Sequence, residues 1–317
     1  MNPTFDLTSE AQQISATTRL GMMGNIVLLI SKIVVGAVVG SLALIADGFN
    51  SLTDILTDVA VMIGTSLGVK PADENHPYGH GKIETFVAGV VEIGVLSVGI
   101  GIVYSGVKAL IAGPKVVENG WAVVGVAAFT IACKEWLFHR TRKVAESSRS
   151  TALKAKAWDH RSDVAVSAVV LAGGVGSVVN WPYGDVIAGL SVGVVILVVG
   201  FRLAFDTLIE LTEGWAGGET VARIAEVLKN EPEVRGWHKL RTRRIGRELL
   251  MDVHVMINPN LTVLESHKIV RRLEATIRDA LDWPVNFTIH IDPDSDEIRL
   301  ARIAASDQTL KDIPRID

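Results

Sequence analysis

The most regular feature of the chain is a series of long apolar stretches separated by short polar segments. Six stretches hold about twenty or more residues with few charges, the length at which an α-helix crosses a lipid bilayer. We expect transmembrane helices over about 18–39, 41–68, 86–112, 119–139, 155–180 and 183–209. The first stretch is followed by no small-residue cleavage pattern before the second, so we expect it to be retained and not removed as a signal peptide.

After about residue 210 the pattern changes to that of a water-soluble domain with mixed charge. It predicts helices over 219–230 and 263–281 and strands over 235–245, 248–257 and 286–291. The predicted fold class is a membrane all-α six-helix transmembrane domain plus a C-terminal cytoplasmic α+β domain, metallochaperone-like, in the order αββαβ. The expected divisions are an N-terminal cytoplasmic segment at 1–17, a six-span transmembrane domain at 18–209, a cytoplasmic domain at 210–293 and a polar C-terminal tail at 294–317.

Composition and charge support a membrane protein and orient it. The 317 residues are 49% hydrophobic and 6% aromatic with 29 glycines, which suits packed transmembrane helices. The connection before the fifth stretch is strongly basic, with His139, Arg140, Arg142, Lys143, Arg149, Lys154 and Lys156. The connections on the opposite side of the membrane are nearly uncharged. The positive-inside rule then places the basic loops and both termini in the cytoplasm. We expect an integral protein of a bacterial inner membrane, or of an intracellular membrane derived from it.

Two absences in the sequence exclude other classes of protein. The single cysteine, Cys133, excludes a disulfide within the chain and a site built from several thiolates, and we interpret it as a packing residue. The sequence has no phosphate-binding loop and no nucleophile with a paired base, so we do not expect an enzyme.

Two polar pairs lie inside predicted membrane helices, Asn50/Asp54 and Asp159/Asp163. A spacing of four places both members of a pair on one helix face, so two such helices could offer four oxygen ligands to one cation. Carboxylates in a bilayer are costly and usually functional. The alternative is that protonation, or an ion pair with a lysine such as Lys32, neutralises them.

Spacing alone does not decide which of the polar residues on these two helices form the site. Several residues fall on or near one stripe of the second predicted helix, namely Asp47, Asn50, Ser51, Asp54 and Asp58. In the fifth, His160 lies three residues before Asp163 and is either a ligand or a packing residue. Asp54, near the middle of its stretch, is the strongest individual candidate.

Histidines form two further groups outside the membrane stretches. Asp73, His76 and His80 fall within eight residues of a loop that could close around one metal ion; otherwise the histidines are solvated and the loop is a simple turn. In the soluble domain the candidates are spread over four predicted elements, and only the last two share a strand face: His238, His254, His267, His290 and Asp292. Residue pattern alone favours ordinary surface histidines there.

Four motifs together resemble the cation diffusion facilitator family of divalent metal/proton antiporters. They are ADGFNSLTD at 46–54, HPYGHGK at 76–82, AWDHRSD at 157–163 and IHIDP at 289–293, and the resemblance covers about residues 15 to 292. It implies a transport site at Asn50, Asp54, Asp159 and Asp163. It also implies a loop site at Asp73, His76 and His80, and a binuclear site at the dimer interface of the cytoplasmic domain from His238, His254, His267, His290 and Asp292.

The resemblance assigns one structural residue as well. Lys82 matches a family lysine that pairs with an acid near the end of the sixth helix, here Glu210 or Glu213. The alternative is a lysine that extends its ammonium to the membrane surface without a partner.

Two departures from the family pattern bear on the metal. Zinc-type members commonly carry histidine where this chain has Asp159, and many bacterial members carry aspartate where it has Asn50. An all-oxygen set suits manganese or iron, and such a set resembles the manganese- and iron-associated branches, including magnetosome relatives. The complete histidine set of the cytoplasmic domain is more familiar from zinc-type members, so the two regions favour different metals.

The function expected from this resemblance is export of a divalent transition metal by proton antiport, with manganese or iron ahead of zinc. The expected partners are metal ions, protons, a second copy of the chain and the lipid bilayer, with no nucleic acid and no prosthetic group. The alternatives are a zinc or broad-range exporter, or a non-transporting membrane sensor or assembly scaffold.

Overall fold

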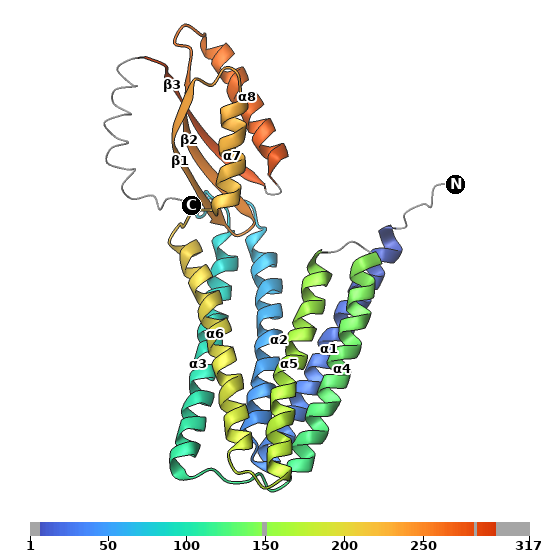
Figure 1. The fold of residues 1–317 in the computed structure, drawn as a ribbon. Coiled ribbons are helices and arrows are strands. Elements are labelled where there is room, and N and C mark those ends of the chain that lie inside the picture. The colour runs from blue at the N-terminus through green and yellow to red at the C-terminus, as the bar shows by residue number, and fades with distance from the viewer. Residues whose placement is uncertain (1–6, 148–150, 282–283, 296–317) are drawn as a thin grey trace. The chain divides into compact units, whose positions relative to one another are not determined.

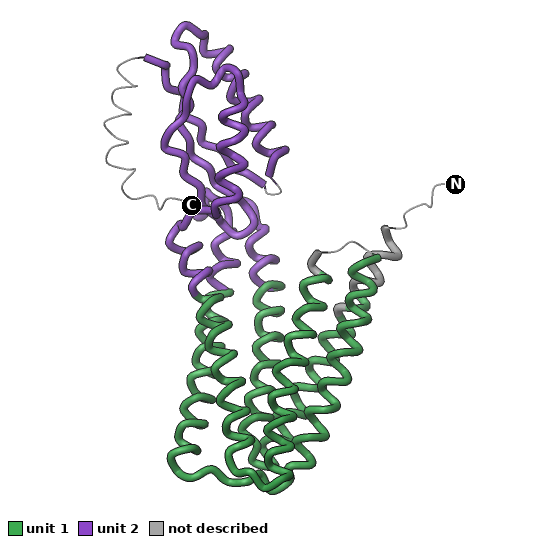
Figure 2. Tube along the Cα trace, viewed as in Figure 1, with its two compact units in different colours: residues 1–62, 88–204 green, residues 63–87, 205–317 purple. Residues whose placement is uncertain are grey.

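The chain forms two compact units, which Figure 2 shows in different colours. The computed structural model describes residues 7–147, 151–281 and 284–295. Arg149 of the basic loop, residues 1–6 of the predicted N-terminal segment and residues 296–317 of the predicted tail lie outside the described residues. The helical unit contains residues 1–62 and 88–204, and the C-terminal unit contains residues 63–87 and 205–317.

Long helices coincide with the six predicted membrane stretches (Figure 1). They are α1 (Leu7–Val39), α2 (Leu42–Gly68), α3 (Lys82–Ala112), α4 (Gly120–Ser147), α5 (Thr151–Val178) and α6 (Gly184–Leu211). Among the described residues, five of them are long and apolar enough to cross a membrane by length and composition, all except α2. Three aspartates, at 47, 54 and 58, lower the hydropathy of α2. A helical transmembrane domain is therefore confirmed.

Two helices extend furthest beyond the predicted stretches. α1 begins at Leu7, ahead of residue 18, and α4 continues to Ser147, past residue 139. Neither extension contains glycine or proline, so nothing in the local sequence ends the helix where its apolar stretch ends.

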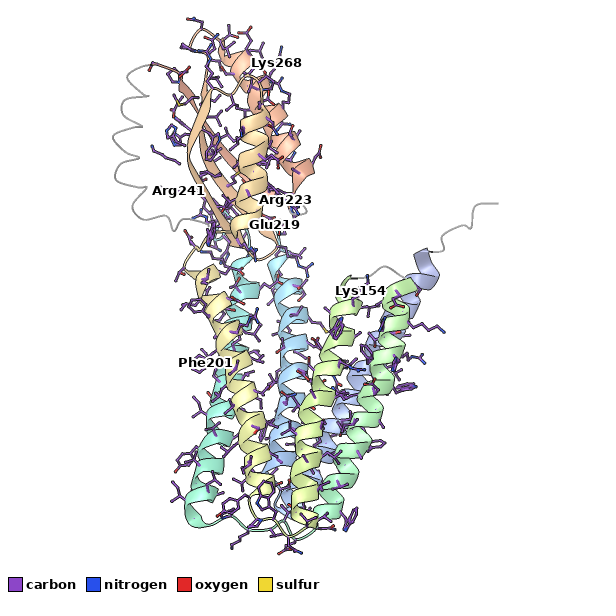
Figure 3. The ribbon with its side chains drawn as sticks, viewed as in Figure 1. Lys154, Phe201, Glu219, Arg223, Arg241 and Lys268 are labelled. Atoms are coloured by element: carbon purple, nitrogen blue, oxygen red, sulfur yellow. The ribbon has the colours of Figure 1, made fainter. Side chains whose placement is uncertain are left out.

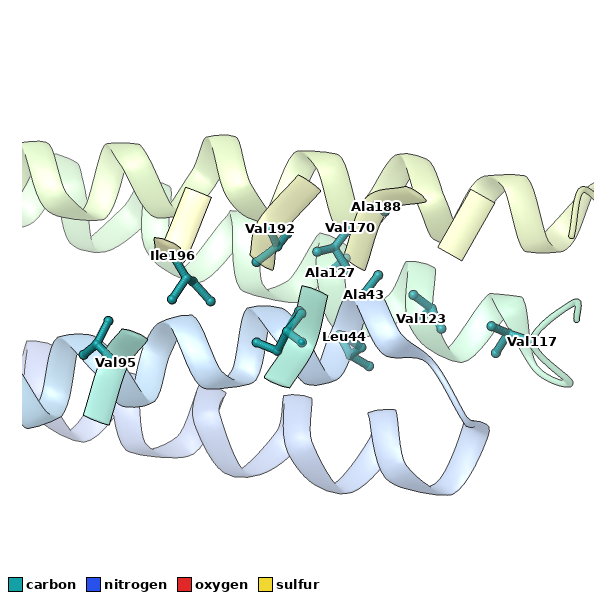
Figure 4. Close-up of a cluster of buried hydrophobic side chains, with 12 residues drawn as sticks. Ala43, Leu44, Val95, Val117, Val123, Ala127, Val170, Ala188, Val192 and Ile196 are labelled. Atoms are coloured by element: carbon teal, nitrogen blue, oxygen red, sulfur yellow. The ribbon is translucent and has the colours of Figure 1, made fainter. Parts of the chain in front are cut away.

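Small residues allow the helices of the helical unit to approach one another closely. A Cβ atom added at Gly48 of α2 would lie 2.6 Å from Ile33 Cδ1 of α1, and one at Gly193 of α6 would lie 2.8 Å from Ile102 Cγ2 of α3. Such close contacts are typical of membrane helices, whose association depends on packing. The core between them is shown in Figure 4; it includes Ala43, Leu44, Val95, Val123, Ala127, Val170, Ala188, Val192 and Ile196.

The C-terminal domain has the predicted αββαβ order. Its elements are α7 (Gly218–Asn230), β1 (Gly236–Ile245), β2 (Glu248–Ile257), α8 (Val263–Ala280) and β3 (Val285–Pro293). The sheet order is β1-β2-β3, with β1 antiparallel and β3 parallel to the central strand β2.

Both helices of this domain pack on one face of the sheet. Alternate residues of β2, including Met251 and Val253, are buried in a core with Ile224 of α7 and Leu273 of α8. The outer faces of the helices are charged: Arg223 donates to Glu219 on α7 at 2.7 Å, and Lys268 is exposed on α8 (Figure 3). Among the residues that the structure describes, the opposite face of the sheet, which carries the other set of alternate residues, has no helix of the domain against it.

Local capping fixes the start of α8. Thr262 Oγ1 accepts a hydrogen bond from the Glu265 amide at 3.3 Å, and a Glu265 carboxylate oxygen accepts one from the Thr262 amide at 2.8 Å. This reciprocal pair satisfies two amides that the helix itself leaves without partners. The Thr262 amide hydrogen bond also holds the pKa of Glu265 below its ordinary value.

Candidate metal centres

The polar pairs of α2 and α5 meet inside the helical unit. Asn50 Nδ2 donates to Asp163 Oδ1 at 3.3 Å, which joins one member of each pair. The carboxylate of Asp54 interacts electrostatically with Asp163 and Asp159. Within the described residues, the oxygens of the three aspartates do not gather within 4.8 Å of one another. The structure thus brings the two helix faces together, with the carboxylates spaced more widely than a closed ligand set.

A lysine that the sequence reasoning missed lies at this site. Lys134 of α4 is fully buried, and its Nζ donates to Asp163 Oδ2 at 2.5 Å and to Asn25 Oδ1 of α1 at 2.8 Å. The signal was present in the sequence, because a lysine in the middle of an apolar stretch is as costly as an aspartate there.

Two aspartates of α2 form ion pairs with other lysines. Lys32 Nζ donates to Asp47 Oδ1 at 2.9 Å, and both side chains are fully buried. Lys156 of α5 contacts Asp58 at 2.7 Å, and both of these side chains are partly exposed. Lys32, the partner considered from sequence, therefore neutralises Asp47, and Asp54 forms no ion pair in the described part of the chain.

His160 lies on α5 beside the two polar pairs, and its ring faces α1. Its side chain is buried, and Nε2 lies 3.6 Å from where a Cβ atom of Gly21 in α1 would stand. Its Nδ1 has no hydrogen-bond partner among the residues described. This contact favours the packing interpretation of His160.

The loop between α2 and α3 draws its three candidate ligands together. Ligand atoms of Asp73, His76 and His80 all lie within 4.8 Å of one another. Asp73 Oδ1 lies 3.3 Å from His76 Nδ1, and Asp73 Oδ2 lies 3.3 Å from His80 Nε2. Gly79, with a φ of 79°, makes the turn that returns His80 to Asp73.

Backbone hydrogen bonds prepare Asp73 as an anion. The His76 amide donates to Asp73 Oδ1 at 2.7 Å, and the Asn75 amide donates to the same oxygen at 3.0 Å. The His76 amide is the main cause that lowers the pKa of Asp73 below its ordinary value. The carboxylate is therefore ionised at neutral pH, as a metal ligand must be.

A second cluster lies on the open face of the sheet in the C-terminal domain. The strand register places His238 of β1 beside His254 of β2, and His254 beside His290 of β3. Asp292 is their common partner, because its oxygens lie 3.4 Å from His238 Nε2, 3.0 Å from His254 Nδ1 and 3.1 Å from His290 Nε2. Ligand atoms of His238, His254 and Asp292 lie within 4.8 Å of one another.

His267 does not join this cluster within one copy of the chain. It is exposed on α8, whose buried residues Ile269 and Leu273 pack on the helix-covered face of the sheet. The other four candidates stand on the opposite face, so His267 is separated from them by the sheet.

Lys82 forms an ion pair in the C-terminal unit. Its Nζ donates to Glu213 Oε1 at 3.0 Å, and Arg243 of β1 donates to Glu213 Oε2 at 2.6 Å. These two hydrogen bonds, with that of Lys82 the larger cause, lower the pKa of Glu213. Glu210, the other partner considered from sequence, accepts instead from Thr85 Oγ1 at 2.6 Å and from the Gly246 amide at 3.0 Å.

Two family models match the chain. Residues 19–212 match the cation efflux transmembrane domain, and residues 216–294 match the cytoplasmic domain of cation efflux proteins. The C-terminal part also aligns with a metal-bound C-terminal domain of the CzcD transporter from Thermotoga maritima, at 23% identity and a TM-score of 0.23, over 24% of this chain and 87% of that one.

Curated relatives extend over most of the sequence. Metal tolerance protein 2 of Oryza sativa subsp. japonica is 31% identical, covering 86% of this chain and 77% of the relative. Magnetosome protein MamB of Magnetospira sp. (strain QH-2) is 30% identical, covering 81% of this chain and 89% of the relative. The manganese efflux system protein MneP of Bacillus subtilis (strain 168) is 28% identical, covering 90% of this chain and 99% of the relative.

The family match settles the class of protein. An integral membrane domain with polar pairs on α2 and α5 is joined in one chain to a domain that carries a histidine and aspartate cluster. The chain belongs to the cation efflux family, also called the cation diffusion facilitators, which transport divalent metal ions and are not enzymes.

Proposed function

We propose that the chain is a homodimeric exporter that moves manganese or iron, in preference to zinc, out of the cytoplasm in exchange for protons. The observation that carries this proposal is the contact between the Asn50 amide and the Asp163 carboxylate at 3.3 Å. It joins two helix faces that offer amide and carboxylate oxygens, without imidazole at the four positions. Hard oxygen donors suit manganese and ferrous iron. The name of the relative MneP, a manganese efflux protein, agrees with this choice.

The transport step follows from competition for the same oxygens. In the inward-facing state Asp54, Asp159 and Asp163 bind the dehydrated ion, and Asn50 contributes a neutral ligand. After the helices rock to the outward-facing state, protons bind the carboxylates and release the metal, because ligands must be deprotonated to hold it. The same three carboxylates thus carry the metal in one direction and protons in the other.

The clusters outside the helical unit would sense metal in the cytoplasm. Asp73, His76 and His80 form one site, and the sheet cluster around Asp292 forms another at a dimer interface, with His267 supplied from the facing copy. Metal that binds the dimer better than separate domains favours the transport-competent assembly. Both termini and both clusters then lie on the cytoplasmic side.

The decisive experiment is manganese uptake into inside-out vesicles under an imposed pH gradient. Asp54→Ala should abolish uptake, whereas Asp206→Ala, which removes an exposed acid of α6, should leave it unchanged. Uptake at the wild-type rate by the Asp54→Ala variant would refute the site. A wild-type flux that ignores the pH gradient would refute proton antiport.

Zinc is the second candidate for the exported ion. The imidazoles clustered at Asp292 and at Asp73 are typical zinc ligands, which favours it. Parallel fluxes of manganese, ferrous iron and zinc from purified protein in proteoliposomes separate the two candidates. A larger zinc flux would replace manganese in the proposal, and the absence of flux for all three ions would favour a membrane sensor or scaffold.

A further inference from the structure

The fully buried ammonium of Lys134 stands where three helices of the helical unit meet. It donates to Asp163 Oδ2 of α5 at 2.5 Å and to Asn25 Oδ1 of α1 at 2.8 Å, while its own helix is α4. A lysine at this depth is tolerated only when it is paired and hydrogen-bonded. Asn25 provides an acceptor that does not belong to the proposed metal site.

Both oxygens of Asp163 are engaged by protein donors. Lys134 holds Oδ2, and the Asn50 amide faces Oδ1 at 3.3 Å. A metal ion that binds Asp163 through Oδ2 must displace the ammonium. Because Asn25 already accepts from the same nitrogen, the ammonium has a place to remain when it loses Oδ2.

Charge balance gives the lysine a second effect. When all three aspartates of the site are ionised they carry three negative charges. Lys134 interacts electrostatically with Asp54 and Asp159 and balances one of these charges, while Lys156, which also interacts with both, is paired with Asp58. One divalent cation balances the two charges that remain. Without the lysine the site would hold the ion with an extra negative charge, and release would be slower.

We propose that Lys134 is a positioning residue of the transport cycle, a tethered ammonium that competes with the metal for Asp163 and so limits affinity in favour of release. This inference rests on the proposed transport function. It predicts that loss of the ammonium tightens metal binding, whereas loss of its alternative acceptor weakens it.

The test compares variants in metal binding and in flux. Lys134→Met should lower the Kd for manganese about tenfold, and it should lower both KM and kcat because release becomes limiting. Lys134→Arg keeps the charge and should return both constants toward wild type. Asn25→Leu should raise KM, because the ammonium then has only Asp163 to bind. Equilibrium binding is measured in a His80→Ala, His254→Ala background, which removes the two other clusters.

A matched control separates this effect from the loss of any buried lysine. Lys32→Met removes an equally buried ammonium that pairs with Asp47, and it should lower stability without lowering KM. A fall in KM in that control would overturn the inference, as would unchanged or weaker manganese binding by Lys134→Met. If Lys134→Met does not fold, a KM for Asn25→Leu at or below the wild-type value overturns it. Absence of wild-type flux would refute the transport proposal, while calorimetric manganese binding would still decide the role of Lys134.

Discussion

Replacement of Asp292 by asparagine tests whether the sheet cluster binds metal. The carboxylate of Asp292 contacts His238, His254 and His290, at 3.4, 3.0 and 3.1 Å. Asparagine has the same shape, so the substitution removes the charge and one acceptor oxygen with little change in packing. The histidines would keep their places on β1, β2 and β3.

The size of the effect follows from Coulomb's law. Two unit charges 4 Å apart interact by about 1 kcal/mol in water, so a divalent ion loses about 2 kcal/mol when one carboxylate charge disappears. That loss corresponds to about a 30-fold increase in Kd. The side chain of Asp292 is only 14% exposed, so water screens the interaction incompletely and this value is a lower limit.

The assay is calorimetric titration of zinc and manganese into the full chain, in an Asp54→Ala, His80→Ala background that disables the other two proposed sites. Asp252→Asn is the matched control, because Asp252 lies on the same face of β2, two residues before His254, where it pairs in register with Arg241. Asp292→Asn should raise the Kd at least about 30-fold and the control should not. Equal Kd values for Asp292→Asn and its parent would show that the cluster is not a metal site.

Three further predictions concern selectivity, acid stability and capping. Asn50→Asp combined with Asp159→His should raise zinc flux relative to manganese flux in proteoliposomes, because imidazole favours zinc; an unchanged ratio would contradict the role of these positions. Glu213, whose pKa is lowered by Lys82, contributes stability above its ordinary pKa of 4.5 that is lost as the pH falls through the lower folded value. Lys82→Met should therefore shift acid unfolding of the C-terminal domain to higher pH, and coincident acid curves for the variant and wild type would reject this. Thr262→Ala should cost about 1 kcal/mol and speed hydrogen exchange of the first α8 amides about fivefold, whereas Thr262→Ser should not.

Much of the fold could be predicted because periodicity and length report burial directly. The apolar stretches gave the six helices, and the alternation and order after residue 210 gave the αββαβ domain. The helix ends were less predictable, since α4 runs on to Ser147 as long as no residue breaks it. Hydropathy shows where a helix leaves the membrane, but it does not show where the helix itself ends.

The candidate sites divide in the same way. The loop residues Asp73, His76 and His80 are close in sequence, so their proximity could be expected. The contact of His238 and His254 with Asp292 depends on strand register and on a parallel crossover, which no local pattern contains, whereas the shared face of His290 and Asp292 follows from alternation along β3.

Partner choice among the buried charges was the least predictable feature. Lys32 could have neutralised any aspartate of α2, and only the packing of α1 against α2 assigns it to Asp47. Lys134 lies on a different helix from both polar pairs, so its position beside Asp163 depends on the packing of α4 against α5, which no local pattern contains.

The lysines and aspartates inside the helical unit share one charge balance. Three lysines pair with three of the five aspartates on α2 and α5: Lys32 with Asp47, Lys134 with Asp163 and Lys156 with Asp58. In the described part of the chain the remaining two aspartates, Asp54 and Asp159, form no ion pair. When both are ionised, one divalent ion neutralises their two charges. Loss of any of these lysines adds one negative charge to the unit, but among the three only Lys134 donates to an aspartate of the proposed transport site, so its loss should alter metal release most.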